Sequence, residues 1–60
     1  MMVGTSYDVF ADGVYYDTIS NKAAALNTAA ALAKNYTSVI VINTITDCVE
    51  FVHGPVVVNE

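Results

Sequence analysis

The sequence predicts an α+β fold of the ββαββ type, in which a single helix packs on one face of a four-stranded antiparallel sheet. The first observation is Asp12-Gly13, a dipeptide typical of a two-residue hairpin turn, between two β-rich segments. The second is an alanine-rich stretch over residues 21–35, and the third is a pair of β-rich segments over 38–43 and 48–53. Neighbouring elements of a chain usually lie side by side, so we expect the strand order 2-1-3-4.

The turn fixes the predicted register of the first hairpin. A two-residue loop at Asp12-Gly13 places Phe10 opposite Tyr15 and, further along, Asp8 opposite Asp17. Because side chains alternate along a strand, the face expected to meet the core holds Tyr7, Val9, Ala11, Val14 and Tyr16. The opposite face holds Ser6, Asp8, Phe10, Tyr15, Asp17 and Ile19.

A helix is predicted from Asn21 to Asn35. The Ser20 hydroxyl can cap its first turn, and Asn35 is a residue type that adopts the left-handed conformation at helix ends. The apolar half of the helix gathers Ala23, Ala25, Leu26, Ala29, Ala30, Leu32, Ala33 and Tyr36. Alanine lets a helix lie close to a sheet but buries little area, so we expect a thin core.

The segment 38–43 is β-branched on both faces, which is typical of a central strand covered from both sides. A four-residue turn at 44–47 leads to the last predicted strand. It places two apolar pairs on the helix side, Ile40 with Phe51 and Ile42 with Val49. The far side then holds Val39, Val41, Cys48, Glu50 and Val52.

The chain is predicted to form one small domain over residues 1–60, with an ordered core over about 5–53. Gly54-Pro55 ends the fourth strand, because proline lacks the N–H that a sheet ladder needs. Residues 54–60 form a tail, in which Val56 to Val58 can add a short fifth strand to this sheet or to a neighbour's.

Composition and charge exclude several classes of function. The chain has six acidic residues, two lysines and no arginine, which argues against a nucleic-acid partner. Its apolar runs are far shorter than the ~20 residues of a membrane helix. The N-terminus lacks the pattern of a signal peptide, so we expect a cytoplasmic protein. One cysteine allows neither an internal disulfide nor a zinc site.

The face of the predicted sheet that the helix leaves uncovered is our candidate interaction site. It would display Phe10, Tyr15, Ile19, Val39, Val41 and Val52, with Asp8, Asp17 and Glu50 among them. Such an apolar surface is typical of an interface, either with a second copy of the chain or with another protein. A domain of this size usually gains only about 3–5 kcal/mol from its core, which favours a homodimer or larger assembly.

Few residues suggest chemistry. Asp8 and Asp17, if opposed, repel each other unless a basic group of a partner lies between them; otherwise they are two hydrated carboxylates. A metal site would need further ligands, and Glu50 lies far along the sheet. His53 with Cys48 has no supporting catalytic motif, and the four tyrosines are expected in the core and at its rim. We therefore expect no enzyme, no cofactor and no metal.

The layout resembles a loose group of short reading frames of phages and mobile elements, together with small domains that share their ββαββ order. The residues that carry the resemblance are Tyr7 to Gly13 as first hairpin, Ala24 to Lys34 as an Ala/Leu helix, and Val39 to Ile42 as the following strand. It spans roughly residues 6–53. The resemblance implies a stoichiometric binder, such as an inhibitor of a bacterial defence system, and assigns no functional residue.

These observations favour two interpretations of function. In the first, the chain is a homo-oligomeric protein-binding module, such as a phage-encoded inhibitor that blocks a host protein in the host cytoplasm. In the second, it is a small homo-oligomeric protein that sequesters a ligand between subunits or has a structural role. A stable complex with a host protein would favour the first, and a metabolite retained through purification would favour the second.

Overall fold

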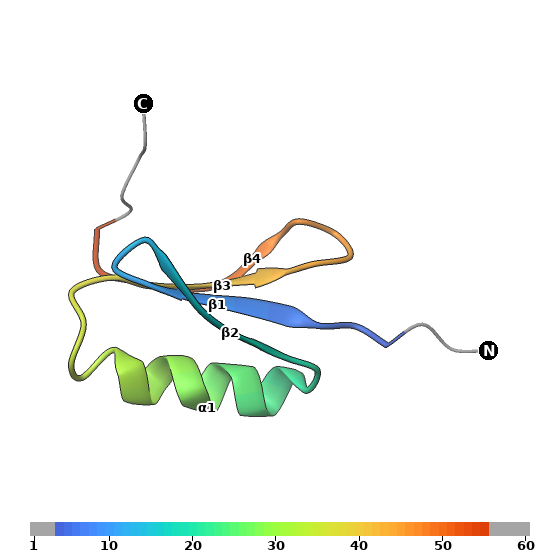
Figure 1. Cartoon of the computed structure of the whole chain (residues 1–60), viewed down its shortest axis with the longest axis horizontal. Helices are drawn as coiled ribbons and strands as arrows, with labels where there is room; N and C mark the ends of the chain where they lie inside the picture. The colour runs from blue at the N-terminus through green and yellow to red at the C-terminus, as the bar shows by residue number, and fades with distance from the viewer. Residues whose placement is uncertain (1–3, 56–60) are drawn as a thin grey trace.

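The computed structural model describes residues 4–55, which form four strands and one helix in the order ββαββ (Figure 1). The elements are β1 (Tyr7–Ala11), β2 (Val14–Ile19), α1 (Lys22–Leu32), β3 (Val39–Asn43) and β4 (Val49–His53). They build one antiparallel sheet with the order β2-β1-β3-β4, so the predicted fold class and strand order are confirmed. The possible fifth strand at Val56 to Val58 lies outside the described residues.

Helix α1 covers one face of the sheet and packs against β1, β2 and β3. In Figure 1 the helix lies at the bottom, and the sheet formed by the two hairpins lies above the helix. Within residues 4–55, no second helix covers the opposite face. The described part of the fold therefore has two layers, with one sheet face that no described element covers.

The core between helix and sheet is thin. Its largest fully buried side chains are three valines, Val9, Val39 and Val41. Ala25 and Ala29, one helical turn apart, lie against them without any exposed surface. Methyl groups on the helix allow close approach but remove little apolar area from water, as the sequence predicts.

The first hairpin turns as predicted and then departs from the predicted register. Asp12 and Gly13 have φ values of 52° and 80°, the left-handed pair of a type I′ turn. Next to the turn, Phe10 lies opposite Tyr15 as expected. The register then shifts, and Tyr16 is an extra residue, a β-bulge.

The bulge makes the predicted opposition of Asp8 and Asp17 wrong, because Asp8 faces Thr18 and Asp17 faces Val9. An extra residue reverses the faces of all later residues on its strand. Ile19, predicted on the open face, therefore lies opposite the buried Tyr7 and packs against the core.

The predicted faces of β3 are also wrong. Val41 lies opposite Val9 and Val39 opposite Ala11, so both valines face the helix, and Ile40 and Ile42 face away from it. A Val-Ile-Val-Ile run has the same apolar character on both faces and does not indicate its orientation. The pairing with β1 decides it. Asp12 anchors that pairing, since its N–H donates to the Ser38 carbonyl (2.7 Å) and its Oδ1 accepts from the Ser38 N–H (3.0 Å).

The second hairpin repeats the pattern of the first. Ile42 lies opposite Val49 as predicted, although on the open face, and the loop closes with a bond from the Asn43 N–H to the Cys48 carbonyl (2.8 Å). The register then shifts at Glu50, which makes the predicted pairing of Ile40 with Phe51 wrong. Phe51 lies opposite Val41 on the helix side instead.

The helix begins and ends differently from the prediction. Asn21, rather than Ser20, is the N-cap: its backbone is extended, and its Oδ1 accepts from the Ala24 N–H at 3.0 Å. The helix ends at Leu32, with Ala33 as a right-handed C-cap, and Asn35 does not adopt a positive φ. The chain instead leaves the helix through further turn-like bonds, such as Tyr36 N–H to the Leu32 carbonyl (2.9 Å).

Candidate functional site

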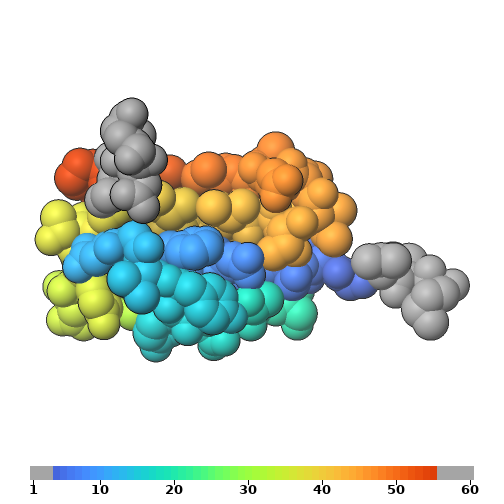
Figure 2. Space-filling view, turned by 45° about the horizontal axis from the view of Figure 1, so that its top comes forward, coloured from blue at the N-terminus to red at the C-terminus, as the bar shows by residue number. Residues whose placement is uncertain are grey.

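The helix-free face of the sheet consists of two rows of side chains that run across all four strands. We call them the apolar row and the mixed row. Each residue lies opposite the next one in its row. The apolar row is Tyr15, Phe10, Ile40 and Val52, and the mixed row is Thr18, Asp8, Ile42 and Val49. Figure 2 looks toward this face, where the four strands appear as successive bands of colour and α1 shows only at the lower edge.

The apolar row keeps much of its surface in contact with water. Tyr15 is 55% exposed and Val52 is 48% exposed, and the two central residues of the row are half-buried. The rings of Phe10 and Tyr15 meet edge to face, with centroids 6.0 Å apart and an interplanar angle of 73°. This is a favourable aromatic geometry, which holds the two rings in place on the surface.

The mixed row contains a short chain of hydrogen bonds. Thr18 Oγ1 donates to Asp8 Oδ1 at 2.7 Å, and the Tyr15 hydroxyl lies 2.8 Å from the same Thr18 oxygen. Since the single hydroxyl proton of Thr18 goes to Asp8, Tyr15 is the donor in the second bond. These two hydrogen bonds hold the Tyr15 ring in place. They also give the Asp8 carboxylate a hydroxyl as its hydrogen-bond partner, so that it needs no cation.

The predicted site residues divide into two groups. Four of them come together on the helix-free face: Asp8, Phe10, Tyr15 and Val52. For the other five the predicted face is wrong. Ile19, Val39 and Val41 face the helix, and the two valines have no exposed surface.

The remaining two misplaced residues are acids at the bulges. Asp17 lies opposite the buried Val9, on the helix side. Glu50 forms an ion pair with Lys22 at the start of α1, with Nζ and Oε1 3.3 Å apart. The open face therefore carries one of the three acids predicted for it, Asp8.

Four residues of the face were not among the predicted site residues: Thr18, Ile40, Ile42 and Val49. One signal could have found the two isoleucines. The fully buried side chains of the core are no larger than valine, whereas larger helix-side residues such as Ile19 and Phe51 are only partly buried. In the central strand β3, Val39 and Val41 therefore suit the fully buried face, and the bulkier Ile40 and Ile42 suit the open face.

The described residues offer little for catalysis. Within residues 4–55 no three His, Cys, Asp or Glu side chains gather as a metal site requires. Cys48 precedes β4 and His53 ends it, so these two lie at opposite ends of the strand. No helix in the described part of the chain is long and apolar enough to cross a membrane.

Comparisons with protein families, curated proteins and solved structures found no match to this chain. The function proposed below therefore rests on the residues and geometry of the chain itself.

Proposed function

We propose that this chain is a non-enzymatic protein-binding module that docks through its helix-free face, and that a second copy of the chain occupies this face. The observation that carries the proposal is the apolar row, which crosses all four strands and leaves Tyr15 and Val52 about half exposed. Partly exposed aromatic and aliphatic side chains without a covering layer are typical of interfaces.

The order of the row suits pairing with itself. A two-fold axis parallel to the strands, between two stacked sheets, places β2 of one copy over β4 of the other. Tyr15 then packs on Val52 of the partner subunit, and Phe10 packs on Ile40 of the partner subunit. The same axis keeps the two Asp8 carboxylates apart, since β1 lies over the partner's β3.

The edges of the sheet favour stacking of faces over extension of the sheet. Both edge strands carry a bulge, Tyr16 on β2 and Glu50 on β4. Bulges twist an edge and interrupt the row of N–H and C=O groups that an added strand would pair with. A second copy would therefore bind on the open face rather than beside an edge strand.

The thin core supports the same proposal. The fully buried side chains of the core are no larger than valine, and small domains with little buried area commonly gain stability by oligomerisation. Inhibition of a host protein, implied by the resemblance to phage and mobile-element proteins, stays a prediction. In that case the dimer would meet the target with surfaces other than the helix-free face.

Light scattering on a sizing column tests the proposal. We expect wild-type protein at about twice the chain mass of 6.4 kDa, and Val52→Lys at the monomer mass, because the lysine would be buried without a partner. Val14→Lys is the matched control: Val14 is also an exposed edge-strand valine, but it lies opposite Ala11 on the helix side. A monomeric wild type, or equal dissociation by both variants, would contradict the homodimer.

A charge-complementation experiment tests the geometry of the dimer. Tyr15→Glu and Val52→Lys should each be monomeric alone. When they are mixed, the introduced acid and lysine face each other at one contact, while the other contact keeps its native pair. We therefore expect a heterodimer in the mixture. If both variants are monomeric and their mixture stays monomeric, the proposed axis is wrong.

A further inference from the structure

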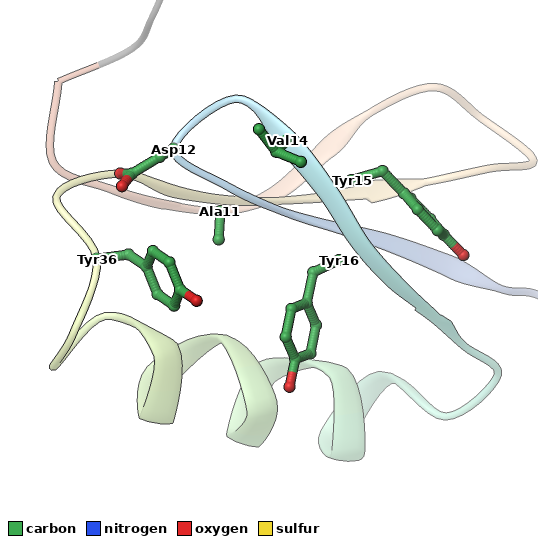
Figure 3. Close-up of a pocket in the computed structure, with 6 residues that line it drawn as sticks. All are labelled: Ala11, Asp12, Val14, Tyr15, Tyr16 and Tyr36. Carbon is green, nitrogen blue, oxygen red and sulfur yellow. The ribbon is translucent and has the colours of Figure 1, made fainter.

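A hollow of about 360 Å³ lies at the first hairpin, next to the chain that follows α1. It is lined by Ala11, Asp12, Val14, Tyr15, Tyr16 and Tyr36. Figure 3 shows the rings of Tyr16 and Tyr36 on either side of the small Ala11 side chain; Tyr16 points from β2 toward the helix layer, and Tyr36 extends from the loop after α1 toward Tyr16. The Tyr15 ring points away from these two rings, and its hydroxyl is hydrogen-bonded to Thr18.

Two local features of the backbone place these rings. Tyr16 is the bulge residue of β2, so it shares the helix side of the sheet with Asp17, its neighbour. Tyr36 follows the end of α1, where its N–H donates to the Leu32 carbonyl at 2.9 Å. Tyr16 is 50% exposed and Tyr36 is 39% exposed. Neither ring is therefore fully packed into the core, and both can contact a ligand.

Asp12 is the one charged residue among those that line the hollow. The Asp12 carboxylate lies at its rim, where one oxygen accepts from the Ser38 N–H. Lys34 is close in sequence but is not among the lining residues.

We propose that this hollow binds an alkylammonium group between the rings of Tyr16 and Tyr36. The electron-rich faces of tyrosine rings attract organic cations, and alkylated ammonium groups lose little hydration on entering an aromatic site. Asp12 supplies the opposite charge at the rim, and Ala11 leaves space at the floor. A carboxylate or phosphate ligand would be repelled by the same groups.

The hollow shares Tyr15 with the docking face, but the two rings proposed to hold the cation do not belong to that face. Tyr16 and Tyr36 lie on the helix side, whereas the apolar row lies on the other side of the sheet. A substitution of Tyr36 should therefore leave the molar mass in solution unchanged, so failure of one proposal does not decide the other.

NMR titration with choline and with its neutral isostere 3,3-dimethylbutan-1-ol tests the need for positive charge. We expect choline to give saturable shift changes at the Ala11 methyl group and at the Tyr16 and Tyr36 rings, and the alcohol to bind at least about five-fold more weakly. Equal affinity for both compounds, or shift changes confined to other residues, would overturn the proposal.

Three variants test the residues. Tyr36→Leu keeps apolar bulk but removes the ring, and should weaken choline binding about five-fold or more. Tyr36→Phe keeps the ring and should bind like the wild type. Asp12→Asn keeps an oxygen for the Ser38 N–H but removes the charge, and should also weaken binding. The amide spectrum of each variant confirms its fold. Wild-type affinity in Tyr36→Leu would contradict the role of the rings.

A third ligand separates two sources of the ammonium group. N-acetyl-trimethyllysine amide presents the group as a partner's side chain would, whereas choline is a free small molecule. Tighter binding of the lysine derivative assigns the hollow to a protein side chain, and tighter binding of choline assigns it to a free amine. If neither cation binds, the hollow is not an ammonium site.

Discussion

Gly54 follows β4 and passes very close to the chain before β3. Its φ is +76°, and a β-carbon at this position would collide with the carbonyl oxygen of Thr37. Gly13, in the first hairpin turn, has a similar φ of +80°, but a β-carbon there would meet open space. The two glycines therefore share a conformational requirement and differ in steric freedom.

This difference predicts unequal effects of alanine. Gly13→Ala should lower the free energy of unfolding by about 1–2 kcal/mol through backbone strain alone. Gly54→Ala should lower it further, by about 3 kcal/mol or more in total, because the chain near Thr37 must also shift. Urea unfolding followed by circular dichroism, at one protein concentration, measures both. Equal losses in the two variants would show that the contact with Thr37 relaxes easily.

The position of the first turn was predictable from the sequence, whereas the residue that caps the helix was not. The Asp12-Gly13 turn follows from two residues that tolerate positive φ. The N-cap did not follow, because Ser20 and Asn21 are adjacent and both are good caps. The extended backbone of Asn21 decides between them, and that conformation depends on how the chain leaves β2.

The two bulges are the main features at the level of strands. Each is one extra residue on an edge strand, and each turns its side chain toward the helix layer. Tyr16 thereby lines the hollow, and Glu50 reaches Lys22. The ion pair is partly exposed, so it contributes at most about 1 kcal/mol and serves mainly to join β4 to the start of α1.

Deletion of Tyr16 tests the role of the first bulge. The flanking pairs, Phe10 with Tyr15 and Val9 with Asp17, can then follow each other in a regular ladder, so we expect the same fold by circular dichroism. The straighter edge should associate further, which light scattering would show as species larger than the wild type. Tyr16→Ala, which removes the ring but keeps the bulge, should not. An unfolded deletion variant beside a folded Tyr16→Ala would show that the fold requires the bulge.

The bulges also explain how far the candidate site could be predicted. Phe10 and Tyr15 were placed correctly because they lie between the turn and the bulge, whereas Ile19 lies beyond it. Val52 lies on the predicted face only because two errors cancel, the inverted face of β3 and the bulge at Glu50. Alternation carries no information about an extra residue, because a bulge depends on tertiary packing.

For the molecule as a whole, the fold was predictable because the strands and the helix differ clearly in composition. The connections between them are short, so only a few topologies are possible. The orientation of β3 was not, since its pairing with β1 joins residues far apart in the chain. Self-association through the open face stays a proposal, supported by the apolar row and by the small side chains of the core.

Dimerisation predicts that thermal stability depends on protein concentration. A ten-fold increase in concentration should raise Tm by about 5 °C for a dimer of chains of this size, because association stabilises the folded state by mass action. Val52→Lys should have a lower Tm that does not change with concentration. Differential scanning calorimetry over a hundred-fold range measures both. A wild-type Tm that stays constant over that range would count against a dimer that forms on folding.

The bonds between Asp12 and Ser38 have a consequence for the speed of folding. Each hairpin pairs residues that are close in the chain, so both can form within microseconds. The halves of the sheet join only through β1 and β3, where the Asp12–Ser38 contact spans 26 positions. When Asp12 meets Ser38, the residues between them lose conformational entropy before many new contacts form. We therefore expect this loop closure to be the slow step of folding. The joining of β1 to β3, at one corner of the sheet, is then expected to set the rate at which the whole chain folds.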